Sequence, residues 1–172
     1  MKRLLVDINV LLDAILVRPL HAGKAAGIWD AVEGGRATGV VSAHAVTTLF
    51  YLLARGRGAS AASRAVADVL RLFEVAPVDE RVLRRALNLG WADFEDAVLV
   101  AAAEGAACDL IVSRDPAGYR MSPVDTVDPA SALVLLERPA GPERVSEAGR
   151  ASYRNRRAAV PARRGRRIAP SR

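Results

Sequence analysis

Short apolar runs alternate with longer helical patterns through residues 2–137. The runs that read as strands lie at residues 2–7, 37–42, 74–79 and 109–115, with a fifth, shorter one within 123–128. The segments with apolar residues at helical spacing lie at residues 9–16, 21–35, 43–58, 60–73, 79–90, 93–107 and 129–137. Strands that alternate with helices pair in parallel through crossovers. The pattern therefore predicts an α/β fold, an α/β/α sandwich around a short parallel sheet.

The positive charge is concentrated at one end of the sequence. The 172 residues carry a net charge of +6, but residues 137–172 alone hold eleven Arg against three Glu, a net of +8. The first 136 residues are therefore slightly acidic, with a net charge of −2. The basic end is also rich in Pro and poor in large apolar residues, a composition that cannot bury enough surface to order itself. We predict one folded domain over residues 1–137 and a disordered basic tail over 138–172.

The content of cysteine and histidine excludes several classes of protein. One cysteine, Cys108, cannot form a disulfide within the chain, and together with two His it cannot supply the usual four ligands of a structural zinc site. A reducing cytoplasm is the expected compartment. Charged residues interrupt every apolar run before about 18 residues, and Asp7 interrupts the first one, so neither a membrane span nor an export signal is expected.

Four acids fall where a parallel sheet presents functional groups. Asp7 and Asp115 follow two of the predicted strands, and Asp93 and Asp96 lie in the first turn of a predicted helix, three residues apart. Clustered carboxylates repel one another unless a cation neutralises them, and oxygen ligands favour Mg²⁺ or Mn²⁺. Such a site supports metal-assisted hydrolysis of a phosphodiester. The alternative for each acid is a helix cap or loop residue, and Asp93 suits an N-cap equally well.

Two stretches of the sequence, VDINVLLDAIL and DFEDAVLVAAAEGAACDLIVSRD, resemble the PIN domain, a small metal-dependent nuclease fold that includes VapC-type toxins of toxin-antitoxin pairs. The resemblance covers residues 1–137. It implies that Asp7, Asp96 and Asp115 are catalytic acids that bind Mg²⁺ or Mn²⁺. It also implies supporting roles for Asn9, which orients Asp7, for the additional acid Asp93 and for the hydroxyl of Ser113.

The sequence departs from the family pattern at one position. PIN domains usually carry a second acid, most often Glu, in the helix after the second strand, and the aligned residue here is Thr48. A hydroxyl cannot replace the charge of a carboxylate, so we expect weaker metal binding or turnover unless another acid compensates. The candidates are Glu33, Asp13 and Glu95. His44 lies near this gap, either as a ligand or, more simply, as a polar residue at a helix start.

The resemblance implies an endoribonuclease that acts on RNA and, in a toxin, is inhibited by a small antitoxin protein. A homodimer is also expected, and Trp29, Phe50 and Tyr51 would offer apolar surface for it. The main alternative is a PIN-like module that binds RNA or protein but has lost catalysis. A metal-dependent phosphatase or DNA nuclease is a further alternative. The haloacid-dehalogenase type of phosphatase is disfavoured because its first strand needs Asp-x-Asp, whereas this chain has Asp7-Ile8-Asn9.

Overall fold

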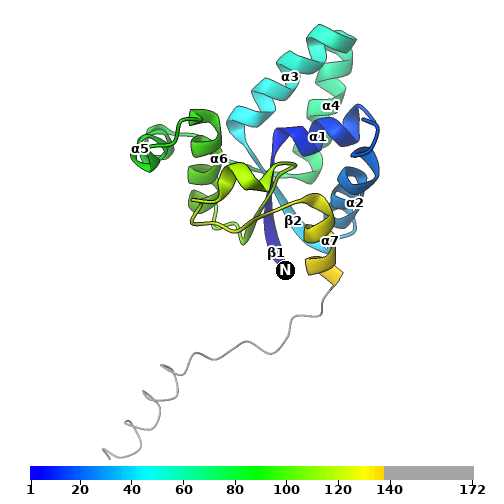
Figure 1. The fold of residues 1–172 in the computed structure, drawn as a ribbon. Helices are drawn as coiled ribbons and strands as arrows, with labels where there is room; N and C mark the ends of the chain where they lie inside the picture. The colour runs from blue at the N-terminus through cyan, green and yellow to red at the C-terminus, as the bar shows by residue number, and fades with distance from the viewer. Residues whose placement is uncertain (138–172) are drawn as a thin grey trace, which may run out of the picture. The chain divides into compact units, whose positions relative to one another are not determined.

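A computed structural model of the chain describes residues 1–137. They form five strands, seven α-helices and one 3₁₀ helix, with two α-helices between successive strands from β1 to β4. Figure 1 shows their arrangement. In chain order they are β1 (Lys2–Val6), α1 (Ile8–Ile15), α2 (Ala22–Glu33), β2 (Ala37–Ser42), α3 (Ala43–Arg57), α4 (Ala59–Leu72), β3 (Glu74–Ala76), α5 (Glu80–Leu89), α6 (Phe94–Gly105), β4 (Leu110–Val112), the 3₁₀ helix η1 (Pro116–Tyr119), β5 (Thr126–Val127) and α7 (Pro129–Glu137).

The strands form one parallel sheet in the order β3-β2-β1-β4-β5. The central strand β1 is paired on both sides, with Leu4 opposite Gly39 of β2 and opposite Leu110 of β4. Because β1 is buried between two strands, its sequence is a continuous apolar run, as is typical of buried parallel strands. All carboxyl ends of a parallel sheet lie at the same edge, so the residues that follow β1, β2 and β4 are brought together there.

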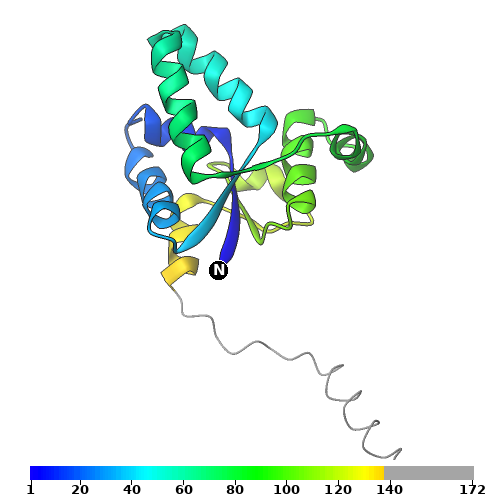
Figure 2. The same cartoon turned by 180° about the vertical axis from the view of Figure 1, so that it is seen from behind.

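Helices cover both faces of this sheet (Figures 1 and 2), and a hydrophobic core lies on each face. Leu4 and Val6 of β1 point to one face, which α1, α2, α3, α4 and α7 cover. Leu5 points to the other, which α5 and α6 cover. Alternation of side chains along a strand places consecutive residues on opposite faces, so one apolar run serves both cores. The predicted α/β/α sandwich with a short parallel sheet is confirmed.

Several local predictions hold in detail. Strand β3 stops just before Pro77 and lies at a sheet edge, as its proline indicated. Helix α2 ends at a glycine pair in which Gly35 adopts a left-handed φ of 66°. The sequence pattern did not predict η1.

The predicted tail, residues 138–172, lies outside the described residues. No helix within residues 1–137 is long and apolar enough to cross a membrane.

Candidate functional site

Asp7 occupies the junction between β1 and α1. Its backbone N–H extends the sheet by donating to the Val112 carbonyl, and its carboxylate caps α1 by accepting the Asn9 N–H at 3.3 Å. The Ser113 hydroxyl donates to the other oxygen, Oδ2, at 2.8 Å. Burial raises the pKa of Asp7, and the hydrogen bonds from Ser113 and Asn9 oppose part of that rise. Asp7 is therefore a buried carboxylate held by both of its oxygens.

A second group of acids comes from the start of α6. Asp93 is its N-cap and accepts the N–H groups of Glu95 at 3.0 Å and Asp96 at 3.1 Å, which confirms the capping interpretation. Asp96, half-buried, accepts a hydrogen bond from the Tyr119 hydroxyl at 2.6 Å. Burial raises the pKa of Asp96, the Tyr119 hydrogen bond lowers it, and the negative charges of Asp93, Asp7 and Glu95 raise it again.

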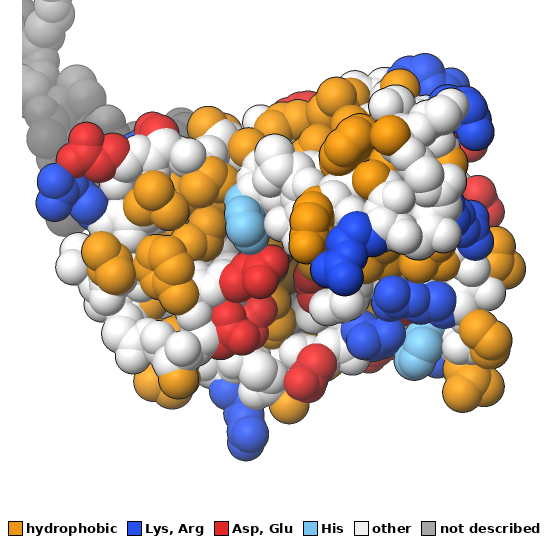
Figure 3. Space-filling view, turned by 90° about the horizontal axis from the view of Figure 1, so that it is seen from above, with side chains coloured by type: hydrophobic (Ala, Val, Ile, Leu, Met, Phe, Trp, Pro, Cys, Tyr) orange, Lys and Arg blue, Asp and Glu red, His pale blue; other side chains and the backbone are white. Residues whose placement is uncertain are grey.

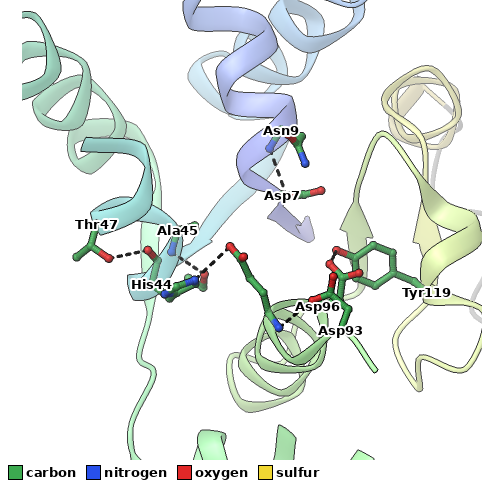
Figure 4. A network of polar contacts seen from close by, with 10 residues as sticks. Asp7, Asn9, His44, Ala45, Thr47, Asp93, Asp96 and Tyr119 are labelled. Atoms are coloured by element: carbon green, nitrogen blue, oxygen red, sulfur yellow. Dashed lines mark hydrogen bonds and ion pairs between the residues drawn. The ribbon is translucent and has the colours of Figure 1, made fainter. Parts of the chain in front are cut away.

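These acids line one cavity of about 300 Å³ at the carboxyl edge of the sheet. The polar residues around it are Asp7, Asn9, Ser42, His44, Thr48, Asp93, Glu95, Asp96 and Tyr119. Figure 4 shows Asp7 on one side and Asp93 and Asp96 on the other, from α6. On the face in Figure 3, acidic side chains gather in a hollow beside a histidine. Leu12, Leu52 and Leu99 contribute to the apolar part of its wall.

Asp115 is placed differently from the other predicted acids. It is exposed, begins η1 and does not line the cavity. Ser113 links it to the cavity. The hydroxyl oxygen of Ser113 accepts the Asp115 N–H at 3.3 Å, and the same hydroxyl donates a hydrogen bond to Asp7. The structure therefore brings Asp7, Asn9, Asp93 and Asp96 together, with Ser113 buried behind Asp7 and Asp115 on the adjacent loop.

Thr48, which the sequence resemblance aligns with the second acid, lines the cavity. Of the acids considered as substitutes, Glu95 also lines it, with its carboxylate 3.2 Å from His44 Nε2. Asp13 is buried elsewhere and paired with arginines, and Glu33 is exposed at the end of α2. Glu95 alone of the three lies in the cavity.

The electrostatics of the cavity favour a cation. No Lys or Arg of residues 1–137 lines it. Apart from the imidazole of His44, its possible metal ligands are carboxylate, amide and hydroxyl oxygens, a set that suits Mg²⁺ or Mn²⁺ better than zinc. Within the same residues, no three or more His, Cys, Asp and Glu side chains converge closely enough to form a ready metal site. The donor chemistry thus fits a hard divalent ion, although the carboxylates are not gathered around one point.

Tyr119 is the site residue that the sequence reasoning missed. It lies in η1, is 5% exposed, and packs edge-on against Trp91 with ring centroids 6.2 Å apart. Burial, the nearby charges of Asp7 and Asp96 and the Asp96 hydrogen bond raise its pKa, so the phenol keeps its proton and acts as a donor. Its one sequence signal is that it is the single aromatic residue of the segment 113–125.

The remaining candidates take structural roles. Trp29 is partly buried and packs edge-on against Phe73 of the core, with ring centroids 5.3 Å apart. Cys108 is half-buried, and burial raises the pKa of its thiol to about 11, which makes it a poor nucleophile. Phe50 and Tyr51 are exposed on α3.

A parallel α/β/α sandwich with an acidic cavity at the carboxyl edge of its sheet defines the class of this domain. The PIN domain profile matches residues 3–117, more than half of the chain. The chain therefore belongs to the PIN domain family. No curated protein matches the sequence significantly.

Solved structures share the fold. VapBC-1 from nontypeable Haemophilus influenzae is similar at 12% identity and a TM-score of 0.60 over 75% of this chain and 99% of that one. FitAcB from Neisseria gonorrhoeae has 18% identity and a TM-score of 0.58, covering 74% and 98%. Mycobacterium tuberculosis VapC20, described as a sarcin-ricin loop cleaving toxin, has 19% identity and a TM-score of 0.52, covering 63% and 86%. At these identities the likeness establishes the fold.

Proposed function

We propose that this protein is a Mg²⁺- or Mn²⁺-dependent endoribonuclease and the toxin of a toxin-antitoxin pair. The observation that carries the proposal is the meeting of Asp7 and Asp96, from β1–α1 and α6, in one cavity that no described Lys or Arg lines. Membership of the PIN family supports the same chemistry. The VapC20 toxin and the VapBC and FitAcB structures support the biological role by analogy.

We assign metal binding to Asp7, Asp96 and Asp115. The Ser113 hydroxyl and the Asn9 backbone hold Asp7 in place. The Tyr119 hydroxyl fixes one oxygen of Asp96, whose carboxylate faces the cavity. Asp115 would act from the loop, on the outer side of the site. When bound, the ion supplies polarisation of the phosphoryl oxygen, activation of a water and stabilisation of the leaving oxygen.

The other residues of the cavity position and shield these acids. Asp93 adds negative charge beside Asp96 while it caps α6. His44 and Glu95 lie together at the cavity, where the imidazole can hold the Glu95 carboxylate in place. The apolar side chains of Leu12, Leu52 and Leu99 exclude water from part of the wall.

The deciding experiment measures cleavage of a mixed-sequence single-stranded RNA with Mn²⁺, Mg²⁺ or EDTA. The wild type is compared with Asp96→Asn, which keeps the shape and the Tyr119 acceptor but removes the charge. The matched control is Asp68→Asn, an exposed acid of α4 that pairs with Arg71. We expect metal-dependent cleavage by the wild type and by the control, and none by Asp96→Asn. Single-stranded DNA and a phosphomonoester, tested in parallel, separate a ribonuclease from the other hydrolases.

A second function is favoured by one observation, the neutral side chain of Thr48 in the cavity. A PIN domain with too little negative charge to hold a metal would act as a binding module for RNA or protein. This hypothesis predicts that the wild type folds but cuts none of the substrates, and that calorimetry detects no binding of Mn²⁺.

The proposed toxin role carries two expectations about assembly. A small antitoxin would insert a basic side chain among the carboxylates of the cavity, which would replace the charge of the metal. A homodimer would bury the exposed apolar residues of α3, Phe50 and Tyr51. Light scattering of the chain alone, and of Phe50→Ser, tests the dimer. The Arg-rich segment 138–172 would add sequence-independent attraction to RNA.

A further inference from the structure

A second cavity adjoins the acidic one. It has a volume of about 280 Å³ and lies between the C-terminal ends of α1 and α3. Leu12 and Leu52 line both cavities, so the two share a wall. Arg18 and Arg57 line the second cavity, which we call the arginine pocket, and neither lines the first. Opposite charges therefore lie on the two sides of one leucine wall.

The positive charge at the arginine pocket is only partly neutralised. Asp13, 2% exposed, accepts hydrogen bonds at Oδ1 from Arg18 at 3.3 Å and from Arg114 at 3.4 Å. Two guanidinium groups thus share a single carboxylate, and both keep more than a third of their side chain exposed. Arg57 is the second cation that lines the pocket, and among residues 1–137 its side chain donates to the backbone carbonyl of Ile15, at 3.4 Å.

The buried carboxylate of Asp13 holds Arg18 in position at the pocket. Arginine presents its donors in a rigid fork that matches phosphate, and Arg18 contacts Asp13 through one nitrogen, which leaves its other N–H groups for a phosphate. Basic side chains also gather beside the acidic ones on the face seen in Figure 3. The arrangement is a set of preorganised phosphate donors next to a cavity that on its own repels a polyanion.

The walls of the pocket suit the rest of a nucleotide. Leu16 and Leu53 line it together with the shared leucines, so apolar surface lies beside the cations. A phosphate flanked by a base or ribose has the matching character, charged at one end and flat and apolar at the other. A purely acidic peptide such as polyglutamate offers the charge, but its carboxylate side chains leave the leucine surface uncovered.

We propose that the arginine pocket binds the nucleotide of a single RNA strand that directly neighbours the bond held in the acidic cavity. Arg18 and Arg57 contact its phosphate, and Leu16 and the exposed Leu52 contact its nucleoside. Because the two cavities share Leu12 and Leu52, one continuous strand occupies both. The choice of RNA rests on the proposed function, whereas the existence of an anion site rests on the arginines themselves.

Binding without cleavage tests this proposal. The affinity of a short fluorescent single-stranded RNA for the full chain is measured by anisotropy in EDTA over a range of salt concentrations. The variants are Arg57→Gln and the double variant Arg18→Gln/Arg57→Gln. The matched control is Arg84→Gln, an exposed arginine of α5 that also pairs with one acid. Since all variants keep the segment 138–172, its contribution to binding cancels.

We expect about tenfold weaker binding by the double variant and a salt slope that falls by about 0.7 for each lost phosphate contact. The Arg84→Gln control should behave as the wild type. Equal affinity and slope for the Arg57→Gln variant and the control would overturn the proposal. Arg57→Gln leaves the Asp13 pairs intact, so it decides the question even if the double variant does not fold.

A second probe separates RNA from a protein partner. Labelled polyglutamate is titrated against the same proteins. If the arginine variants bind polyglutamate more weakly but bind RNA as the wild type does, the proposal is wrong and the pocket binds an acidic protein segment. The cleavage assay with Asp96→Asn reports independently on catalysis. If the wild type cuts no RNA but the arginine variants still bind RNA more weakly than it does, the proposed role of the arginine pocket holds and the proposed nuclease function is wrong.

Discussion

The Tyr119 hydroxyl donates a hydrogen bond to Asp96 Oδ1 at 2.6 Å. This bond joins η1, which follows β4, to the first turn of α6. A phenol is a strong donor, and here it cannot release its proton, because burial and adjacent carboxylates raise its pKa. One oxygen of Asp96 is thereby fixed, and its carboxylate is oriented at the cavity.

Tyr119→Phe removes this donor and keeps the ring that packs on Trp91. We expect a loss of about 1 kcal/mol in the free energy of unfolding and a several-fold weaker Mn²⁺ affinity, because Asp96 loses its fixed orientation. Calorimetry with Mn²⁺ and urea unfolding measure the two effects. Tyr51→Phe, at an exposed tyrosine of α3, is the control. Unchanged Mn²⁺ affinity in a folded Tyr119→Phe protein would limit Tyr119 to a packing role.

Thr48→Glu adds an acid to the cavity at the position that the sequence resemblance aligns with the second acid of PIN domains. A further carboxylate attracts a divalent cation, so we expect roughly tenfold tighter Mn²⁺ binding, which corresponds to about 1.4 kcal/mol. The same charge repels Asp7 and Asp96 in the metal-free protein and should lower its melting temperature. Thr47→Glu, at the exposed neighbour, is the matched control. If both variants bind Mn²⁺ alike, Thr48 does not occupy the position of the missing acid.

The sequence predicted the parts of the fold that depend on local patterns. β1 and β2 follow from compact apolar runs, and α6 from an Asp93 cap ahead of an apolar stretch. The site acids could be anticipated because Asp7 directly follows a strand and Asp96 begins a helix. Parallel pairing then brings such positions to one edge, which is a general property of the architecture.

The missed features depend on partners that are far apart in the sequence. Asp13 pairs with Arg114 across 101 positions, and nothing in the spacing of either residue indicates the other. Tyr119 meets Asp96 only because η1 folds back over α6, and a four-residue 3₁₀ turn carries no periodic signal. Likewise, the outer position of Asp115 reflects the path of its loop, which the strand pattern does not determine.

Gly39→Ala tests the packing behind β2. A Cβ at this position would lie 2.5 Å from Phe73 Cδ1 and 2.8 Å from Val32 Cγ2, inside the larger core. We expect a loss of about 1–3 kcal/mol in the free energy of unfolding, as in other overpacked cores. Gly23→Ala in α2 is the control, because its Cβ would meet nothing within 4 Å and should stabilise the helix by about 0.4–1 kcal/mol. Urea unfolding should therefore shift in opposite directions for the two variants.

Asp7→Asn tests whether the buried acid is maintained at a cost in stability. Burial raises the pKa of Asp7 in the folded protein above its ordinary value of about 3.9, so the charged form destabilises the metal-free fold at neutral pH. Asn keeps the N-cap and removes the charge, and we expect its melting temperature in EDTA to rise by about 2–4 °C.

The sign of the pH dependence follows from the raised pKa. As the pH falls from neutrality through that pKa toward 3.9, wild-type Asp7 takes up a proton in the folded state and its penalty disappears. The advantage of Asp7→Asn should therefore shrink steadily over this range. The pKa of Glu74 is lowered by Arg3, and that of Asp128 by Ser131. These two acids therefore lose their stabilising charge only at lower pH, and they do so equally in both proteins. Thermal melts of the two proteins across this range measure the difference. A constant difference, or a less stable variant at neutral pH, would mean that the hydrogen bonds from Ser113 and Asn9 outweigh the burial of the charge.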